Sequence, residues 1–304
     1  MTSLIQASGL TKYYGRSRGI LDLTFEIEEG EIFGFLGPNG AGKTTTIRTL
    51  MGFLRPSAGR ATIAGLDCWS QAPAVKRLVG YLPSEFAFDP SLTGAQILTY
   101  LGHLRGGVDR SYVQQLCERL DFDPGRRFRE YSRGNRQKLG LIQAFMHRPR
   151  LLILDEPSSG LDPLNQQEFY RMLREVQAEG RTVFLSSHIL PEVEQTCSRV
   201  GIIREGRLVE VNEVSRLKHM RQQTVVISFA GPASPEWFQG LPGVASVQLN
   251  RDGRELHLDV QGDLQAVIKA AAAHDAVSLT TQEPSLEEIF LRFYQLDQPV
   301  AAGR

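Results

Sequence analysis

A glycine-rich segment, GPNGAGKT at residues 37–44, has the spacing G-x-x-x-x-G-K-[ST]. It lies between the apolar run EIFGFLG, which has the composition of a strand, and TTIRTLMGF, whose apolar residues recur at helical spacing. Gly40 and Gly42 permit backbone turns that direct N–H groups inward, and the start of the helix adds the positive end of its dipole. The segment therefore has the chemistry to bind a polyphosphate, and an ordinary glycine-rich turn is the alternative.

The polar residues at the end of this segment suit a nucleotide and its magnesium ion. Lys43 would reach the β and γ phosphates, Thr44 would offer a hydroxyl ligand to Mg²⁺, and Thr45 would contact the α phosphate. The residues of this segment that we expect to bind ATP are Gly37, Pro38, Asn39, Gly40, Ala41, Gly42, Lys43, Thr44 and Thr45.

Two adjacent carboxylates end the run LLILDEP at residues 151–157. If this run forms a strand beside the first one, Asp155 comes near Mg²⁺ and Glu156 can polarise an attacking water. Hydrolysis of a phosphoanhydride requires both roles. Two acidic residues that merely end a strand are the alternative.

The elements around these segments alternate as in a layered α/β domain. Residues from about 84 to 146 are mostly helical in pattern, and strands and helices alternate again after them. The pattern changes near Leu217, so we expect a first domain over 1–217 and a small α+β domain over 218–304, with four strands and a helix between the last two. The segment SLEEIFLRFYQL is predicted to form a terminal helix.

Composition excludes several classes of protein. Lys and Arg total 34 and Asp and Glu total 34, so no bulk charge favours nucleic acid or anionic lipid as a partner. Cys68, Cys117 and Cys197 are odd in number and lack metal-ligand spacing, which favours buried thiols in a reducing compartment. Apolar runs such as LLIL are far shorter than a membrane span, and no signal-peptide pattern is present, so we expect a cytoplasmic protein.

Five features in order make the sequence resemble the ATP-binding subunits of ABC transporters. They are GPNGAGKTT, YSRGN, LLILDEP, SGLD and the histidine after TVFLSS, and the resemblance covers roughly residues 3–215. It implies a P-loop NTPase fold of the ABC ATPase type, with an antiparallel β-subdomain and a helical insert. A small C-terminal α+β domain would follow this cassette.

The resemblance also implies roles for residues outside the glycine-rich loop. In that family two cassettes pack head to tail, and the signature residues, here Ser132 and Gly134, donate hydrogen bonds to the γ phosphate bound by the other cassette. Asp162 would belong to the loop that bridges the two sites, and His188 would contact the γ phosphate as the switch histidine. Tyr14 would stack on adenine. Catalysis would therefore rest on Glu156, His188 and Lys43.

The segment YSRGN departs from the family's commonest signature, LSGGQ, at Tyr131, Arg133 and Asn135. A basic residue at the position of Arg133 is similar to what a subgroup of exporter ATPases carries. A solvated basic face is the alternative for most of the basic residues between 126 and 138.

A second departure follows the strand VGYLP, where the family has a glutamine that touches Mg²⁺. Here Ser84 and Glu85 stand in its place. We expect Ser84 to be a metal ligand together with Thr44 and Asp155, and keep Glu85 as the substitute.

The tail PSLEEIFLRFY, residues 284–294, resembles the carboxy-terminal end of ATPases of ABC-2 type exporters. The resemblance implies ATP hydrolysis with Mg²⁺ that drives export of a drug, antibiotic or lipid through separate permease subunits. The chain would form a homodimer or a heterodimer with a second ATP-binding subunit, on the cytoplasmic face of the cell membrane. A soluble ABC regulator and a module that binds nucleotide without hydrolysing it are the alternatives. A single glycine-rich loop and no heptad run disfavour the first, and the intact Lys43, Asp155, Glu156 and His188 disfavour the second.

Overall fold

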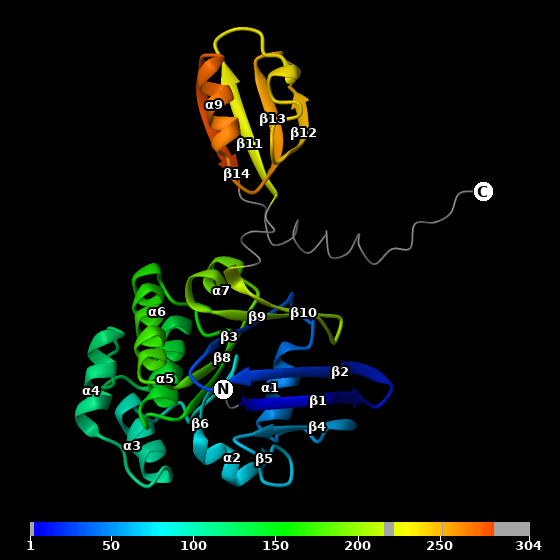
Figure 1. Ribbon diagram of the computed structural model, residues 1–304. Helices are drawn as coiled ribbons and strands as arrows, with labels where there is room; N and C mark the ends of the chain where they lie inside the picture. Colours follow the sequence, from blue (N-terminus) through cyan, green and yellow to red (C-terminus); the bar gives the residue numbers. More distant parts are fainter. Residues whose placement is uncertain (1–2, 216–221, 251, 283–304) are drawn as a thin grey trace. The chain divides into compact units, whose positions relative to one another are not determined.

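The computed structural model describes residues 3–215, 222–250 and 252–282. The chain divides into two compact units, Met1–Val214 and Ser215–Arg304 (Figure 1). Within the described ranges, every helix is too short or too polar to cross a lipid bilayer.

The first unit contains an antiparallel sheet of four strands in the order β2-β1-β4-β5. Along β2, Leu23, Phe25 and Ile27 are buried, whereas Thr24 and Glu26 are exposed, so the alternating pattern places one face on the core. This sheet is the antiparallel subdomain that the sequence predicts. Its strands are β1 (Ser3–Tyr14), β2 (Ser17–Glu28), β4 (Ala58–Ile63) and β5 (Leu66–Asp67).

The second sheet of this unit has six strands in the order β10-β9-β3-β8-β7-β6. The five from β9 to β6 are parallel, and β10 pairs antiparallel with β9. Every residue of β3 and β7 is buried, as a parallel sheet covered on both faces requires. The strands are β3 (Ile32–Leu36), β6 (Val79–Leu82), β7 (Leu151–Asp155), β8 (Thr182–Ser187), β9 (Arg199–Arg204) and β10 (Arg207–Glu213).

The order of this sheet corrects one expectation. The strand that ends in Asp155 is not beside β3, because β8 lies between them and pairs with both. Parallel strands need crossover connections, so neighbours along the chain need not be neighbours in the sheet. The carboxyl ends of β3, β8 and β7 still meet at one edge, where Leu36 pairs with Ser187 and Asp155 with Ser186.

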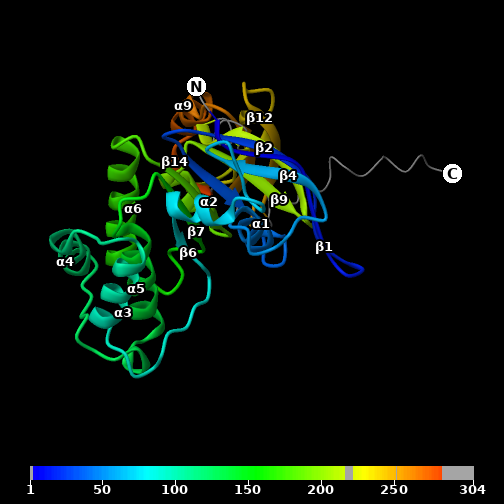
Figure 2. The same ribbon diagram turned by 90° about the horizontal axis from the view of Figure 1, so that it is seen from below.

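Helices cover both faces of the six-stranded sheet. On one face α1 contacts β7 as well as β2 and β4, so it lies between the two sheets, and on the other face α6 and α7 contact β8. Figures 1 and 2 show α3, α4 and α5 gathered beside α6, away from β1 and β2. The helices are α1 (Lys43–Leu50), α2 (Ala72–Leu78), α3 (Gly94–Leu104), α4 (Arg110–Arg119), the 3₁₀ turn η1 (Phe128–Glu130), α5 (Arg133–Phe145), α6 (Pro163–Ala178) and α7 (Leu190–Thr196).

Aromatic side chains fill the space between the two sheets. The ring centroids of Phe35 and Phe184 are 5.4 Å apart, and those of Phe33 and Phe184 are 6.1 Å apart. Phe25 reaches this cluster from β2. Burial of each ring contributes roughly 1.5–3 kcal/mol, so this cluster fixes β3 and β8 and thereby the loops at their ends.

The second unit is the small α+β domain that the sequence pattern indicates. Its antiparallel sheet has the order β12-β13-β11-β14, and Val225, Ile227 and Leu258 pack against Phe238 and Val267 in its core. The predicted terminal helix SLEEIFLRFYQL lies outside the described residues. The elements are β11 (Gln222–Phe229), the 3₁₀ turn η2 (Pro235–Trp237), β12 (Val244–Leu249), β13 (Glu255–Gln261), α9 (Gln265–Ala273) and β14 (Ala276–Gln282).

Candidate functional site

The glycine-rich segment forms the turn between β3 and α1. Gly40 and Gly42 have φ angles of 78° and 112°, which side chains other than glycine rarely adopt. At Gly37, a Cβ atom would lie 2.4 Å from the carbonyl oxygen of Ile203. The glycines are thus required by the turn itself, and the turn leads directly into the N-terminus of α1, where free backbone N–H groups attract anions.

Lys43 lies in this loop with its side chain only 5% exposed. Its ammonium group donates to the carbonyl oxygens of Gly37 at 2.5 Å and Pro38 at 3.2 Å, and lies 3.1 Å from Oε1 of Glu156. The lysine therefore crosses the loop from α1 and contacts the carboxylate that follows β7.

Glu156 joins Lys43 to a third element. It has a φ angle of 53°, and its backbone N–H donates to the carbonyl oxygen of Ser186 at 3.2 Å. Its Oε2 lies 2.6 Å from Nδ1 of His188, the residue after β8. The structure thus brings three of the sequence-predicted residues into one series of contacts, Lys43–Glu156–His188.

Asp155 is fully buried at the end of β7, and its two carboxylate oxygens differ. Oδ1 accepts a hydrogen bond from Ser186 Oγ at 2.6 Å, whereas Oδ2 is buried without a hydrogen-bond partner. A buried carboxylate oxygen without a partner is costly unless a cation or donor reaches it. Mg²⁺ binds through one or two protein oxygens and several waters, so Asp155 and the Thr44 hydroxyl fit this ion.

A cavity of about 400 Å³ is lined by most of the residues predicted to bind nucleotide, but not by Gly37, Ala41, Asp155 or His188. Tyr14 lines it, and the Tyr14 hydroxyl lies 3.3 Å from Thr45 Oγ1. Ser84 lines the cavity, and Glu85 is not among the lining residues. The lining consists of Tyr14, Arg18, Gly19, Pro38, Asn39, Gly40, Gly42, Lys43, Thr44, Thr45, Ser84 and Glu156.

The signature residues Ser132 and Gly134 lie at the start of α5 and do not line this cavity. Ser132 caps the helix, its hydroxyl accepting from the N–H of Asn135 at 3.2 Å. A Cβ atom on Gly134 would lie 2.7 Å from the carbonyl oxygen of Gly160, so the two segments pack closely. Arg133 donates to Ser159 Oγ at 2.9 Å, which gives this basic residue a partner in the loop after β7.

Asp162 caps the next helix, α6. Its carboxylate accepts from the N–H groups of Leu164 and Asn165 and from the Asn165 side-chain amide at 2.6 Å. These hydrogen bonds, first those of the Asn165 backbone and then of its side chain, lower the pKa of Asp162. Like Ser132, Asp162 does not line the cavity.

Comparison with known proteins identifies the family. Residues 20–159 match the ABC transporter family, and residues 213–294 match the family described as ATP-binding protein DrrA1-3-like, C-terminal domain. The bacitracin transport ATP-binding protein BcrA of Bacillus licheniformis is 32% identical over 299 residues, 96% of this chain and 97% of that protein. The chain belongs to the ATP-binding proteins of ABC transporters.

A second relative and a solved structure also match this ABC protein. The daunorubicin resistance ATP-binding protein DrrA3 of Streptomyces coeruleorubidus is 33% identical over 309 residues, 97% of each chain. A solved structure of an ATP-binding subunit of an ABC transporter is 27% identical, with a TM-score of 0.66 over 71% of this chain and 92% of that one. The expected ABC ATPase fold is confirmed, and the protein is an ATPase of this family.

Arg18, Gly19 and Gln137 belong to this ABC ATPase site and had no signal in the sequence. Arg18 and Gly19 line the cavity from the start of β2, and the Arg18 guanidinium lies 3.4 Å from Glu205. Gln137 on α5 donates to the carbonyl oxygens of Glu156 at 3.2 Å and Pro157 at 2.9 Å, which ties α5 to the loop after β7. None of the three belongs to a recognised pattern, and only the fold brings them to the site.

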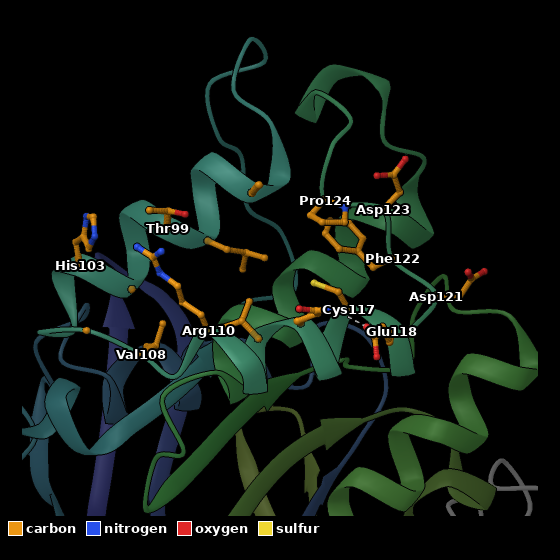
Figure 3. Close-up of a pocket in the computed structure, with 16 residues that line it drawn as sticks. Thr99, His103, Val108, Arg110, Cys117, Glu118, Asp121, Phe122, Asp123 and Pro124 are labelled. Atoms are coloured by element: carbon orange, nitrogen blue, oxygen red, sulfur yellow. Dashed lines mark hydrogen bonds between the residues drawn. The ribbon is translucent and has the colours of Figure 1, made fainter.

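A larger cavity, of about 860 Å³, lies between α3 and α4 (Figure 3). Figure 3 shows Cys117 and Phe122 among its lining, with His103 toward one end. No residue predicted to bind nucleotide or metal lines it. The three cysteines are free and buried as expected, and burial raises the pKa of Cys117 to about 11, so this thiol is not a nucleophile at neutral pH.

Proposed function

We propose that this ABC ATPase hydrolyses ATP to drive export of a drug or antibiotic through separate membrane permease subunits. Two relatives named for bacitracin transport and daunorubicin resistance support this, since each matches the chain over nearly its whole length. The second unit supports it too, because it matches the C-terminal domain of the DrrA-like proteins.

The series Lys43–Glu156–His188 is the observation that carries the catalytic part of the proposal. The loop N–H groups and Lys43 would hold the β and γ phosphates, and phosphate oxygens would compete with Glu156 for the lysine. Glu156 would then accept the proton of the attacking water. His188 would hydrogen-bond the γ phosphate while its Nδ1 stays with Glu156.

Thr44 and Asp155 would hold Mg²⁺, and Ser84, which lines the cavity with Thr44, would contribute its hydroxyl. Mg²⁺ bound there would neutralise charge on the β and γ phosphates as the bond to the leaving group breaks. The buried Oδ2 of Asp155, which has no hydrogen-bond partner, supports this assignment.

Ser132 and Gly134 would complete the site of a second ATP-binding subunit, either a copy of this chain or a related one. Both lie at the N-terminus of α5, a suitable place for γ-phosphate oxygens, and neither lines the cavity of its own chain. Asp162 would lie at the same contact. ATP would thus join two subunits, and hydrolysis would separate them.

The variant Glu156→Gln tests the proposal. It should keep MgATP binding, lose about 100-fold or more in turnover, as expected for a lost general base, and form a dimer in MgATP. Binding of a fluorescent ATP analogue, phosphate release, and mass by light scattering after gel filtration are the measurements. Glu179→Gln, which changes an exposed carboxylate at the end of α6, is the control.

Wild-type turnover by Glu156→Gln would exclude Glu156 as the base. A strictly monomeric complex with MgATP, both alone and in membranes with the permease, would exclude the shared site. Isolation of the dimeric variant from membranes should bring the permease with it, and the identity of that chain tests the export assignment.

A further inference from the structure

We propose that Glu192 is a positioning residue, whose buried carboxyl group acts through Ser187 to hold the turn that carries His188 against Glu156. The inference rests on the proposed roles of His188 and Glu156. Glu192 lies on α7, is 2% exposed and belongs to no motif of the sequence.

One hydroxyl group closes the turn that carries His188. Ser187, the last residue of β8, accepts a hydrogen bond from the N–H of Ile189 through Oγ at 2.9 Å. The same Oγ donates to Oε2 of Glu192 at 2.5 Å. The residues on both sides of His188 are therefore linked by one hydroxyl, and the carboxyl of Glu192 sets where that hydroxyl lies.

The imidazole of His188 has little other support. Its side chain is 46% exposed, and among the described residues its hydrogen-bond partner is Glu156, whose Oε2 lies 2.6 Å from Nδ1. An exposed ring keeps its place only if the backbone below it is fixed. The Glu192–Ser187–Ile189 series supplies that fixed backbone, because Ser187 is fully buried and Glu192 nearly so.

Ser187 and Glu192 also contact or lie near the loops that follow β3 and β7. The carbonyl oxygen of Ser187 accepts from the N–H of Gly37, the first glycine of the phosphate loop, at 3.2 Å. The hydroxyl of Ser158, two residues after Glu156, is close enough to the Glu192 carboxyl to lower its pKa. Glu192 thus lies beneath the point where the loops after β3, β7 and β8 meet.

A buried carboxyl group at position 192 is not expected to stabilise the fold. Burial raises the pKa of Glu192, the Ser187 and Ser158 hydroxyls offset part of that rise, and the charge of Glu156 adds to it. A well-packed apolar side chain would avoid this desolvation. What the carboxyl provides instead is a directional acceptor for Ser187, which an apolar residue lacks.

The test compares Ser187→Ala and Glu192→Ala with Glu192→Gln, which keeps a side-chain oxygen that can accept from Ser187. Displacing a catalytic group by about 1 Å lowers rates up to ~100-fold, so we expect at least a roughly tenfold loss of kcat in both alanine variants. The Kd for MgATP should change less than about twofold, and Glu192→Gln should restore most of the rate. Thr196→Val is the control for loss of a buried hydroxyl on α7, because that hydroxyl donates to the backbone carbonyl of Glu192 and contacts Cys197, and leaves the Glu192 carboxyl with Ser187.

A double-mutant cycle with His188→Ala separates positioning from general structure. If Ser187 acts through His188, adding Ser187→Ala to His188→Ala should change kcat by less than about twofold. Equal losses with and without His188, or a wild-type rate in Ser187→Ala, would overturn the inference. Should Glu192→Ala fail to fold, Ser187→Ala and Glu192→Gln carry the test.

The same set of variants distinguishes this inference from the proposed function. Normal turnover by both His188→Ala and Glu156→Gln would remove the proposed catalytic site itself. A low rate in those two variants beside a normal rate in Ser187→Ala would leave the site in place and reject only the role of Glu192.

Discussion

At the carboxyl edge of the six-stranded sheet, polar side chains that follow three separate strands contact one another, whereas Ser132 and Asp162 cap their own helices, α5 and α6. Lys43, Glu156 and His188 form the first group, and their contacts cross between β3, β7 and β8. Ser132 and Asp162 represent the second group, and both accept hydrogen bonds from N–H groups within the next three residues.

The difference indicates which part of the site one chain can complete. Lys43 and Glu156 of the first group line the 400 Å³ cavity, His188 contacts Glu156, and these contacts lie within one chain. The second group is held rigidly by helix caps and by the contact between Gly134 and Gly160, yet lies outside that cavity. Substitution of Lys43, which would hold the phosphates, should therefore weaken ATP binding by the single subunit, whereas substitutions in the second group should affect only the step that needs two subunits.

The largest effect should come from Lys43→Met. Loss of a charge-assisted contact to two phosphates should weaken MgATP binding about 100-fold or more, and hydrolysis should fall below detection. Lys138→Met is the matched control, since Lys138 is also buried and donates to a backbone carbonyl, that of Asp121, away from the cavity. Equal losses of affinity in both variants would mean that the effect is structural. The role of Lys43 in phosphate binding would then be rejected.

Ser132→Arg should separate binding from turnover. A bulky cation at the start of α5 should leave MgATP affinity of the monomer within about twofold of wild type while it lowers turnover about 100-fold, because the γ-phosphate contact is lost. The missing helix cap costs about 1 kcal/mol, which a urea titration would show. Ser111→Arg, at an exposed position of α4, is the control. An unchanged rate would contradict the second group's role at the dimer contact.

Tyr14→Ala should have a moderate effect on ATP binding at the cavity that Lys43 and Glu156 also line. Stacking of an aromatic ring is worth about 0.5–1.5 kcal/mol, so ATP affinity should fall about three- to tenfold. Tyr13→Ala provides the matched control, because Tyr13 is 44% exposed and Tyr14 45%, and both belong to the same hairpin. Titration with a fluorescent nucleotide measures both. Identical ATP affinities in the two variants would mean that the adenine ring does not stack on Tyr14.

The strands and the glycine loop were predictable, because their signals are local. The alternation in β2, the fully apolar β3 and β7 and the turn glycines each follow from a few neighbouring residues. The helix α2 had no such signal, since its seven residues include a proline and follow a polar stretch. The insertion of β8 between β3 and β7 was also missed, because no local pattern encodes the order of strands across a parallel sheet.

The candidate site divides in the same way. Residues in motifs, such as Lys43 and Glu156, were named from the sequence, and their roles stay predictions until tested. Arg18, Gln137 and Glu192 were not named, because their positions depend on how distant elements pack. The sequence left undecided whether Ser84 or Glu85 replaces the family's glutamine. In the structure Ser84 lines the cavity and Glu85 does not.

Ser84→Ala should give the smallest effect. It tests whether Ser84 or Glu85 takes part in binding Mg²⁺. Ser84 lines the cavity and Glu85 does not, so only the serine hydroxyl is placed to reach a metal ion or one of its waters. Loss of one hydroxyl among several Mg²⁺ ligands should raise the Mg²⁺ concentration for half-maximal hydrolysis about two- to threefold, without a change in metal-free ATP binding. Glu85→Gln should leave the Mg²⁺ titration unchanged. A shifted Mg²⁺ titration in Glu85→Gln beside a normal titration in Ser84→Ala would be the reverse result. It would make Glu85 the substitute for the family's glutamine.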